Sequence, residues 1–225
     1  MEHRRNKARR APAVEWPTVL LAVFCYGTWL AAGLLLWPAH PVIALALLAF
    51  GVALQSSLVH EVLHGHPTRN AMVNEAFVFL PIGLVWPYRR FKTLHLRHHA
   101  DERLTDPSDD PESYYKALWR HEELPAAMKA LLRLNNTMAG RFVLGPWLAT
   151  VGFVIDDFRQ MLAGDRVIRK AWLLHAAGLA VVLAVIAWGF GMPLWLYVLV
   201  PMWLGQVLVA PPPLPPHQGA EPPRG

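Results

Sequence analysis

The run Val42–His66, VIALALLAFGVALQSSLVHEVLHGH, decides how this chain folds. Its first part carries no charged residue and is long enough to cross the ~30 Å hydrocarbon core of a bilayer as a helix. It turns polar only toward its end, where His60, His64 and His66 follow one another. Imidazole is the commonest metal-ligating side chain. The run therefore predicts a transmembrane helix whose polar end presents histidines to a metal ion.

Composition places the chain among integral membrane proteins. It has 225 residues, of which 54% are hydrophobic and only 16% are charged, which is too apolar for an ordinary soluble domain. The formal charge of +5 comes from basic residues that flank the apolar runs. This pattern orients spans in a membrane and does not indicate a nucleic-acid partner. The single cysteine, Cys25, excludes a disulfide framework and a cysteine-based metal site.

The apolar runs predict an all-α integral membrane protein with four transmembrane helices in two hairpins. The expected spans are residues 17–37, 42–60, 171–190 and 193–209. The two hairpin turns carry no Lys or Arg, whereas the N-terminal tail and residues 66–170 are rich in both. By the positive-inside rule, both termini and the histidines lie on the cytoplasmic side, and the expected location is the bacterial inner membrane.

Between the hairpins we expect interfacial helices and an inner-side cap that carries the histidines. The expected elements are a helix at or dipping into the interface at 71–86, an acidic loop at 101–112, an amphipathic surface helix at 122–134 and a re-entrant or interfacial run at 142–155. The last run has only fourteen residues and contains Gly145-Pro146. It is short for a span because about twenty apolar residues are needed to cross a bilayer.

The spacing of the histidines determines what they can bind together. His60 and His64 lie about 40° apart on a helix face and one turn apart along it, so both can point at one ion. In the second cluster, His95-Leu96-Arg97-His98-His99, the first two histidines share a face and the last two diverge by about 100°. Adjacent histidines suit two ions side by side, or one ligand and its hydrogen-bond partner. An all-histidine set near carboxylates suits iron or zinc and not magnesium.

Three further questions about the histidines are open from the residues alone. His60-Glu61-x-x-His64 also matches the zinc-protease pattern of two ligands and a glutamate base, although such an enzyme needs no second cluster. His66 follows Gly65, where the helix is expected to end, so it is either an additional ligand or an ordinary polar residue. His175 lies within the third predicted span, where it either serves a functional site or bonds another helix.

Taken together, the two boxes resemble the membrane fatty acid desaturase and hydroxylase family. The resemblance rests on His60-Glu61-x-x-His64-Gly65, on His95-x-x-His98-His99 and on the Asp-Pro-rich stretch at 105–112 that follows, and it extends over residues 16–209. It implies a di-iron centre that uses O₂ and electrons from a separate carrier, such as ferredoxin, to desaturate a fatty acyl lipid. Hydroxylation of a lipid or carotenoid on the same scaffold is the alternative.

The resemblance also implies roles for individual residues. The implied iron ligands are His60, His64, His95, His98 and His99, with His66 as an additional ligand. Glu61 and Asp101 lie next to the boxes and are expected to orient imidazoles by hydrogen bonding.

The end of the chain departs from the family pattern. The family has a third box, His-x-x-His-His, after the fourth span, but residues 210–225 are Pro-rich and contain only His217. We therefore expect a basic tail at 1–15, a truncated or frame-shifted membrane domain at 16–209 and a disordered tail at 210–225. On this expectation the chain is an inactive desaturase-like protein or a non-enzymatic remnant.

Overall fold

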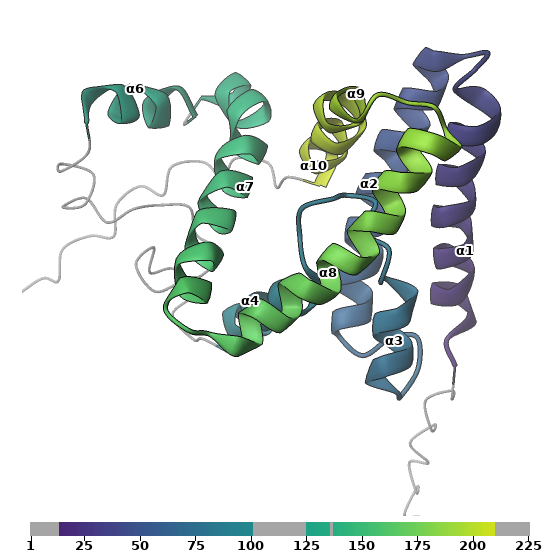
Figure 1. Ribbon diagram of the computed structural model, residues 1–225, viewed down its shortest axis with the longest axis horizontal. Helices are drawn as coiled ribbons and strands as arrows, with labels where there is room; N and C mark the ends of the chain where they lie inside the picture. The colour runs from purple at the N-terminus through teal and green to yellow at the C-terminus, as the bar shows by residue number, and fades with distance from the viewer. Residues whose placement is uncertain (1–13, 101–124, 136, 210–225) are drawn as a thin grey trace, which may run out of the picture.

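The computed structural model describes residues 14–100, 125–135 and 137–209. Within these ranges the secondary structure is helical, apart from one isolated antiparallel bridge between Val14 and Thr68. The expected basic and Pro-rich tails and the acidic loop at 101–112 lie mainly or wholly outside the described residues. The elements are α1 (Trp16–Ala31), η1 (Ala32–Leu36), α2 (Pro41–Leu63), α3 (Ala71–Phe77), α4 (Tyr88–Ala100), α6 (Ala126–Asn135), α7 (Met138–Leu162), α8 (Arg166–Ala184), η2 (Val185–Gly189), α9 (Leu194–Tyr197), η3 (Val198–Met202) and α10 (Trp203–Val209) (Figure 1).

The prediction of an all-α integral membrane protein is confirmed. Four helical segments of the described chain are long and apolar enough to cross a membrane: Trp16–Leu36, Pro41–Leu63, Met138–Leu162 and Arg166–Gly189. Three of them correspond to predicted spans. The exception is Met138–Leu162, which was not predicted as a span. The predicted span at 193–209 is instead a shorter apolar helical run, Leu194–Val209.

The long helix α7 replaces the interfacial run that we expected at 142–155. Pro146 lies inside the helix without ending it. At the start of α7, the hydroxyl of Thr137 accepts a hydrogen bond from the backbone N–H of Gly140. At its other end α7 continues through Asp157, which is fully buried and ion-paired with Arg90. The apolar run at 142–155 underestimates the length of α7, because the helix extends into polar residues at both ends.

The two hairpin helices α1 and α2 lie side by side, as Figure 1 shows. Proline stands in the first turn of each helix, where its missing N–H costs no helical hydrogen bond. The C-terminal run packs on α2 at Gly205, where a Cβ atom would lie 2.5 Å from the side chain of Val52. The absence of a side chain at this glycine therefore permits close approach of the two helices.

The helix predicted at 71–86 is shorter than expected and ends at Phe77. The following irregular segment, residues 78–87, contains the buried residues Val78, Ile82 and Pro87. Its carbonyl groups accept hydrogen bonds from side chains of other helices: Gln55 and Tyr26 donate to Leu80, Tyr197 donates to Ile82, and His175 donates to Leu84. Irregular backbone is tolerated at membrane depth only where the protein satisfies its polar groups in this way.

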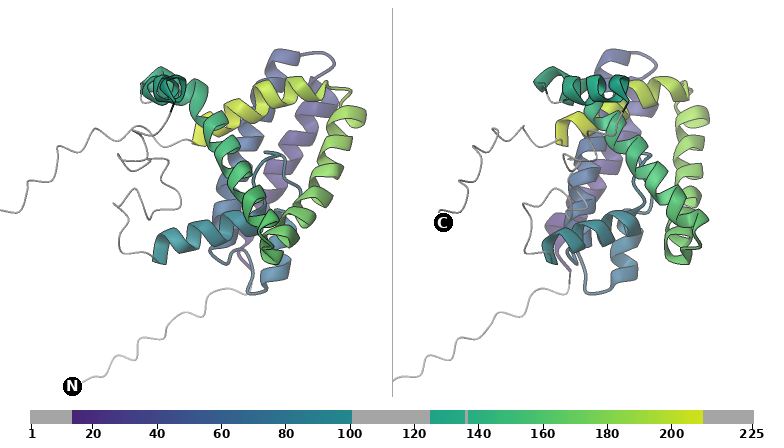
Figure 2. Two further views of the ribbon diagram at one scale, coloured as in Figure 1. Left: turned by 60° about the vertical axis from the view of Figure 1, so that its left-hand side comes forward. Right: turned by 90° about the vertical axis from the view of Figure 1, so that its left-hand side faces the viewer.

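The described elements divide between two ends of the molecule (Figures 1 and 2). One end holds the start of α1, the end of α2, α3, α4 and the turn between α7 and α8. The other end holds the turns at 37–40 and 190–193 and the amphipathic helix α6. The surface helix expected at 122–134 is therefore present as α6, but it lies at the end opposite to α4. This position follows from α7, which is long enough to carry the chain from one end to the other.

Candidate metal centre

Three of the predicted ligands converge in the structure. The nitrogen atoms that His60, His64 and His95 offer to a metal all lie within 4.8 Å of one another. Their ring centroids are 4.8 Å apart for His60 and His64, 4.7 Å for His60 and His95, and 5.5 Å for His64 and His95. The first two residues come from the end of α2 and the third comes from α4. The structure thus joins the two histidine boxes that are far apart in sequence.

The end of α2 presents its two histidines in one direction. His60 lies in the last turn of α2, and His64 follows as its C-terminal cap. The chain then turns away at Gly65, whose φ of +103° lies in the left-handed region that glycine adopts at little cost. Because the helix continues until Leu63, the two imidazoles keep the one-turn separation that the sequence predicts.

Helix α4 brings His95 to this pair. The hydroxyl of Tyr88, in the first turn of α4, lies 3.5 Å from the carbonyl oxygen of Val62 in α2. Tyr88 and His95 are seven residues apart and therefore share a face of the helix. Phe91 stacks on His95 with ring centroids 5.6 Å apart. His95 is only 9% exposed, so it forms the buried side of the cluster, whereas His64 forms its exposed side.

Two ion pairs hold the first turn of α4. Arg89 forms two hydrogen bonds with Glu75 of α3, at 2.7 and 3.0 Å. Arg90 pairs with Asp157 of α7, with a closest distance of 2.6 Å. The indole of Trp172 donates a further hydrogen bond of 2.7 Å to Asp157. Sequence analysis missed Asp157, although a carboxylate that interrupts a long apolar helix is itself a signal of a specific partner.

Burial and neighbouring charges also shift the pKa values of two side chains in this turn, Tyr88 and Arg89. Burial, and secondarily the neighbouring charge of Glu75, raise the pKa of the Tyr88 phenol from 10.0 to about 12. The hydrogen bonds with Glu75 raise the pKa of the Arg89 guanidinium. Tyr88 therefore keeps its proton, and Arg89 its charge, at any physiological pH.

The other expected site residues lie around the cluster or outside the described part. The backbone of α4 places His98 and His99 one turn beyond His95, while their side chains are outside the described residues, as is Asp101. Glu61 lies in the last turn of α2 and is exposed.

Two further histidines have other partners. The Nδ1 atom of His66 lies 2.6 Å from a carboxylate oxygen of Glu15, and the backbone N–H of Glu15 donates to the carbonyl of Pro67 at 2.8 Å. His66 thereby links the start of α1 to the chain that follows α2. The Nε2 atom of His175 lies 2.8 Å from the carbonyl oxygen of Leu84, which favours the hydrogen-bonding interpretation of this residue.

The three clustered histidines fit a single transition-metal ion. Imidazole nitrogens bind zinc at about 2.0–2.1 Å, which brings ligand atoms closer together than the 4.8 Å limit observed here. A second ion needs further ligands, for which His98 and His99 lie on the same helix as His95.

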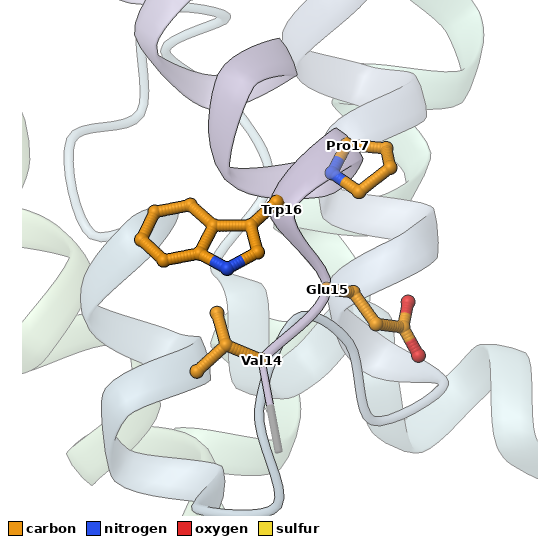
Figure 3. A pocket seen from close by; sticks show the side chains of 4 residues that line it. All are labelled: Val14, Glu15, Trp16 and Pro17. Atoms are coloured by element: carbon orange, nitrogen blue, oxygen red, sulfur yellow. The ribbon is translucent and has the colours of Figure 1, made fainter. Parts of the chain in front are cut away.

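A hollow of about 480 Å³ lies at the start of α1 and is lined by Val14, Glu15, Trp16 and Pro17 (Figure 3). These residues are consecutive in the chain and do not include the clustered histidines. The hollow therefore adds no group to the candidate metal centre.

The fold and the cluster together define a class of protein: helical membrane proteins in which histidines gather at the end of a membrane helix. A comparison with known families identifies one family within this class. The family model described as "Fatty acid desaturase" matches residues 35–224, which is most of the chain. The protein belongs to the fatty acid desaturase family, as the two histidine boxes predict. No curated protein and no solved structure matches the chain.

Proposed function

We propose that this protein is an O₂-dependent, iron-containing membrane oxidoreductase that desaturates fatty acyl chains of lipids. The observation that carries the proposal is the convergence of His60, His64 and His95 in a chain of the desaturase family. In lipid metabolism of this kind, bound iron supplies the chemistry by which O₂ and a pair of electrons remove two hydrogens from an acyl chain. The electrons are proposed to come from a separate donor such as ferredoxin.

Each histidine has a proposed role. His60, His64 and His95 hold one iron ion, and His98 and His99 contribute to a second. Glu61 and Asp101 are proposed to accept hydrogen bonds from ligand imidazoles and so to set their orientation. His66 is proposed to tether the start of α1 through Glu15, because that carboxylate already lies 2.6 Å from its ring nitrogen.

The protein chain itself supplies position and surroundings. His95 and Phe91 close the buried side of the centre, which limits the access of water from that side. Exposed apolar residues cover the membrane helices next to it, among them Leu20, Val23 and Phe24 of α1. A fatty acyl substrate could therefore reach the histidines from the lipid phase. We propose the bacterial inner membrane, with both termini cytoplasmic, as the setting.

A zinc protease is the second candidate, because one observation favours it. Glu61 follows His60 in the pattern His-Glu-x-x-His, and His95 provides the third nitrogen ligand that a catalytic zinc site requires. Membership in the desaturase family favours iron over this alternative.

Metal analysis of the full chain distinguishes these functions. The protein is purified in detergent without oxygen, loaded with Fe(II) or Zn(II), and assayed for each metal per chain. About two irons per chain are expected of a di-iron centre. One tightly bound zinc, with no retention of iron, supports the protease, and no bound metal indicates a non-enzymatic membrane protein.

Lipid profiling tests the reaction. Cells that express the full chain with a reduced electron carrier are compared with cells that express the His60→Ala variant. A new double bond in the acyl chains that depends on His60 is expected, whereas a new hydroxyl group would identify a hydroxylase. An unchanged lipid profile would contradict desaturation by this chain. Because the printed sequence has two of the three boxes that the family resemblance implies, this experiment also tests whether two suffice.

A further inference from the structure

The first turn of α4 is held from three sides. Tyr88 faces α2, Arg89 pairs with Glu75 of α3, and Arg90 pairs with Asp157 of α7. Three consecutive helical residues point about 100° apart, so these contacts surround the helix. Because this turn is restrained in every direction, it sets the rotation of α4 about its own axis.

The contact with Asp157 differs from the other two. Asp157 is 0% exposed and Arg90 is 9% exposed. Three hydrogen bonds join them: Nε of Arg90 donates to both carboxylate oxygens at 2.9 Å, and Nη2 donates to one of them at 2.6 Å. The indole of Trp172 donates to the same carboxylate at 2.7 Å. By contrast, the side chains of the Arg89–Glu75 pair are 42% and 22% exposed, and exposed pairs constrain a structure weakly.

The position of this buried pair relates it to the metal centre. Arg90 and His95 are five residues apart, so they point about 140° apart on α4. One side of α4 is therefore anchored to α7 by three hydrogen bonds of a buried ion pair, while the other side presents His95 to His60 and His64. A rotation of α4 that weakens the contact with Asp157 would also move the His95 ring away from the other two. The same rotation would displace the backbone that carries His98 and His99.

We propose that Asp157 is a positioning residue of the metal centre, which acts through Arg90 to orient the second histidine box. Trp172 supports this role because it fixes the carboxylate from α8. The inference rests on the proposed function in that it assumes a metal at the histidine cluster. It does not require Asp157 to contact metal or substrate, from which Arg90 and α4 separate it.

The test is an Fe(II) titration of the purified full chain and of its Asp157→Asn variant, by competition with a chelator. We expect the variant to bind Fe(II) about tenfold or more weakly, the size of effect typical of a lost outer contact at a metal site. Asp157→Glu, which retains the charge, should recover part of this loss. Asp156→Asn is the matched control, because it makes the same change at the adjacent, exposed position and should bind Fe(II) as the unmodified chain does.

Two additional readouts separate positioning from a general loss of structure. The visible absorption of bound Co(II) reports the number and geometry of its ligands, and we expect it to change in Asp157→Asn and not in Asp156→Asn. Hydrogen exchange without metal should become faster at the amides of residues 91–97 in Asp157→Asn. Equal Fe(II) affinity, Co(II) absorption and hydrogen exchange in Asp157→Asn and the unmodified chain would overturn the inference and leave the proposed function intact. Failure of the unmodified chain to bind Fe(II) or Co(II) would instead overturn both.

A second variant keeps the inference testable if Asp157→Asn does not fold. Loss of one partner leaves a buried charge uncompensated, whereas replacement of both partners by apolar residues is often tolerated. The double variant Arg90→Met/Asp157→Leu should therefore fold, as gel filtration in detergent would show, and still bind Fe(II) at least about tenfold more weakly. Unchanged Fe(II) affinity in a folded double variant would show that the ion pair does not position the histidines.

Discussion

The two ends of this molecule differ in how far ion pairs and hydrogen-bond networks supplement apolar packing. At the end with the hairpin turns at 37–40 and 190–193, aromatic and apolar packing is prominent: Trp29 packs edge-on against Phe190 with ring centroids 4.9 Å apart, and Gly33 lies against the same phenyl ring. The Trp29 indole also donates one buried hydrogen bond, of 2.8 Å, to Tyr197. At the histidine end, which contains the end of α2, α3 and α4, hydrogen bonds and ion pairs supplement a small apolar cluster that includes Leu58 and Val62. Gln55 and Arg90 are buried there, and each has several polar partners.

The difference shows which part of the structure supplies stability and which supplies geometry. Apolar contacts are non-directional, so they stabilise the hairpins but tolerate small rotations. Hydrogen bonds are directional, and a buried polar group left without a partner is costly. The polar end therefore restricts the orientation of α4 more tightly than apolar packing would. A metal centre requires this restriction, because its ligands must lie at defined distances from the ion.

The largest effect is expected from a substitution that removes a ligand at the histidine end. His95→Ala removes one of the three clustered nitrogen ligands and should lower Fe(II) affinity by more than about 100-fold, beyond the effect of losing an outer contact. The denaturation midpoint without metal should change little. His40→Ala, at the opposite and exposed turn, is the control for loss of a histidine. Equal loss of Fe(II) in both variants would contradict the site.

The next effect concerns the irregular segment at 78–87. The side-chain oxygen of Gln55 accepts a hydrogen bond of 3.0 Å from the backbone N–H of Gly83. Gln55→Leu leaves this partly buried N–H without its acceptor and should lower the free energy of unfolding by about 1–3 kcal/mol. It should also weaken Fe(II) binding, because the segment sets where α4 begins.

Unfolding in detergent and Fe(II) titration measure the two consequences of Gln55→Leu separately. Ser56→Ala is its control, since that neighbouring side chain is exposed. A variant that loses stability while it keeps full Fe(II) affinity would show that the segment does not position α4.

A substitution at the apolar end should lower the stability of the protein without affecting Fe(II) binding. A Cβ atom at Gly33 would lie 2.3 Å from the ring of Phe190, so Gly33→Ala should destabilise the protein by about 1–3 kcal/mol through overpacking. Fe(II) affinity should be unchanged. Gly27→Ala is the matched control in the same membrane-length segment, Trp16–Leu36, because nothing lies within 4 Å of its Cβ position; it should be neutral or stabilising by up to about 1 kcal/mol. A parallel loss of Fe(II) affinity in Gly33→Ala would mean that the two ends are not independent.

The smallest effect is a dependence on alkaline pH at Tyr88. Its pKa is raised from 10.0 to about 12 in the folded protein, so the folded state retains a proton that the unfolded state loses. The contribution of the protonated Tyr88 to the free energy of unfolding is present below pH 10 and is lost as the pH rises to about 12. Tyr88→Phe should remove this part of the loss of stability at alkaline pH. Unfolding midpoints of both proteins across that pH range measure it, and identical pH profiles would contradict the burial of the phenol.

Much of this organisation could be predicted from local sequence. The apolar runs predict the membrane class and three of the long helices, and the i, i+4 spacing of His60 and His64 predicts their common direction. The hydrogen-bonding partners could not be predicted in this way. Gln55 lies within an apolar run and Asp157 lies just beyond one, but their partners are 15 to 67 residues away in the chain. Nothing in local periodicity identifies such partners.

The extent of two segments was also beyond local prediction. Pro146 suggested a break, yet α7 continues through it because the ends of the helix find polar partners elsewhere. Residues 78–87 suggested a helix because they are apolar. They are instead irregular, since side chains from other helices satisfy their backbone groups.

The sequence by itself determined the membrane environment, the helical class and the residues available to bind metal. These properties depend on composition and on spacing within one helix, where the backbone geometry is known in advance. Only the tertiary structure decided that His95 meets His60 and His64 and that Asp157 anchors the helix carrying His95. Contacts between distant segments depend on how the intervening chain packs and satisfies its buried polar groups, and no local pattern contains that information.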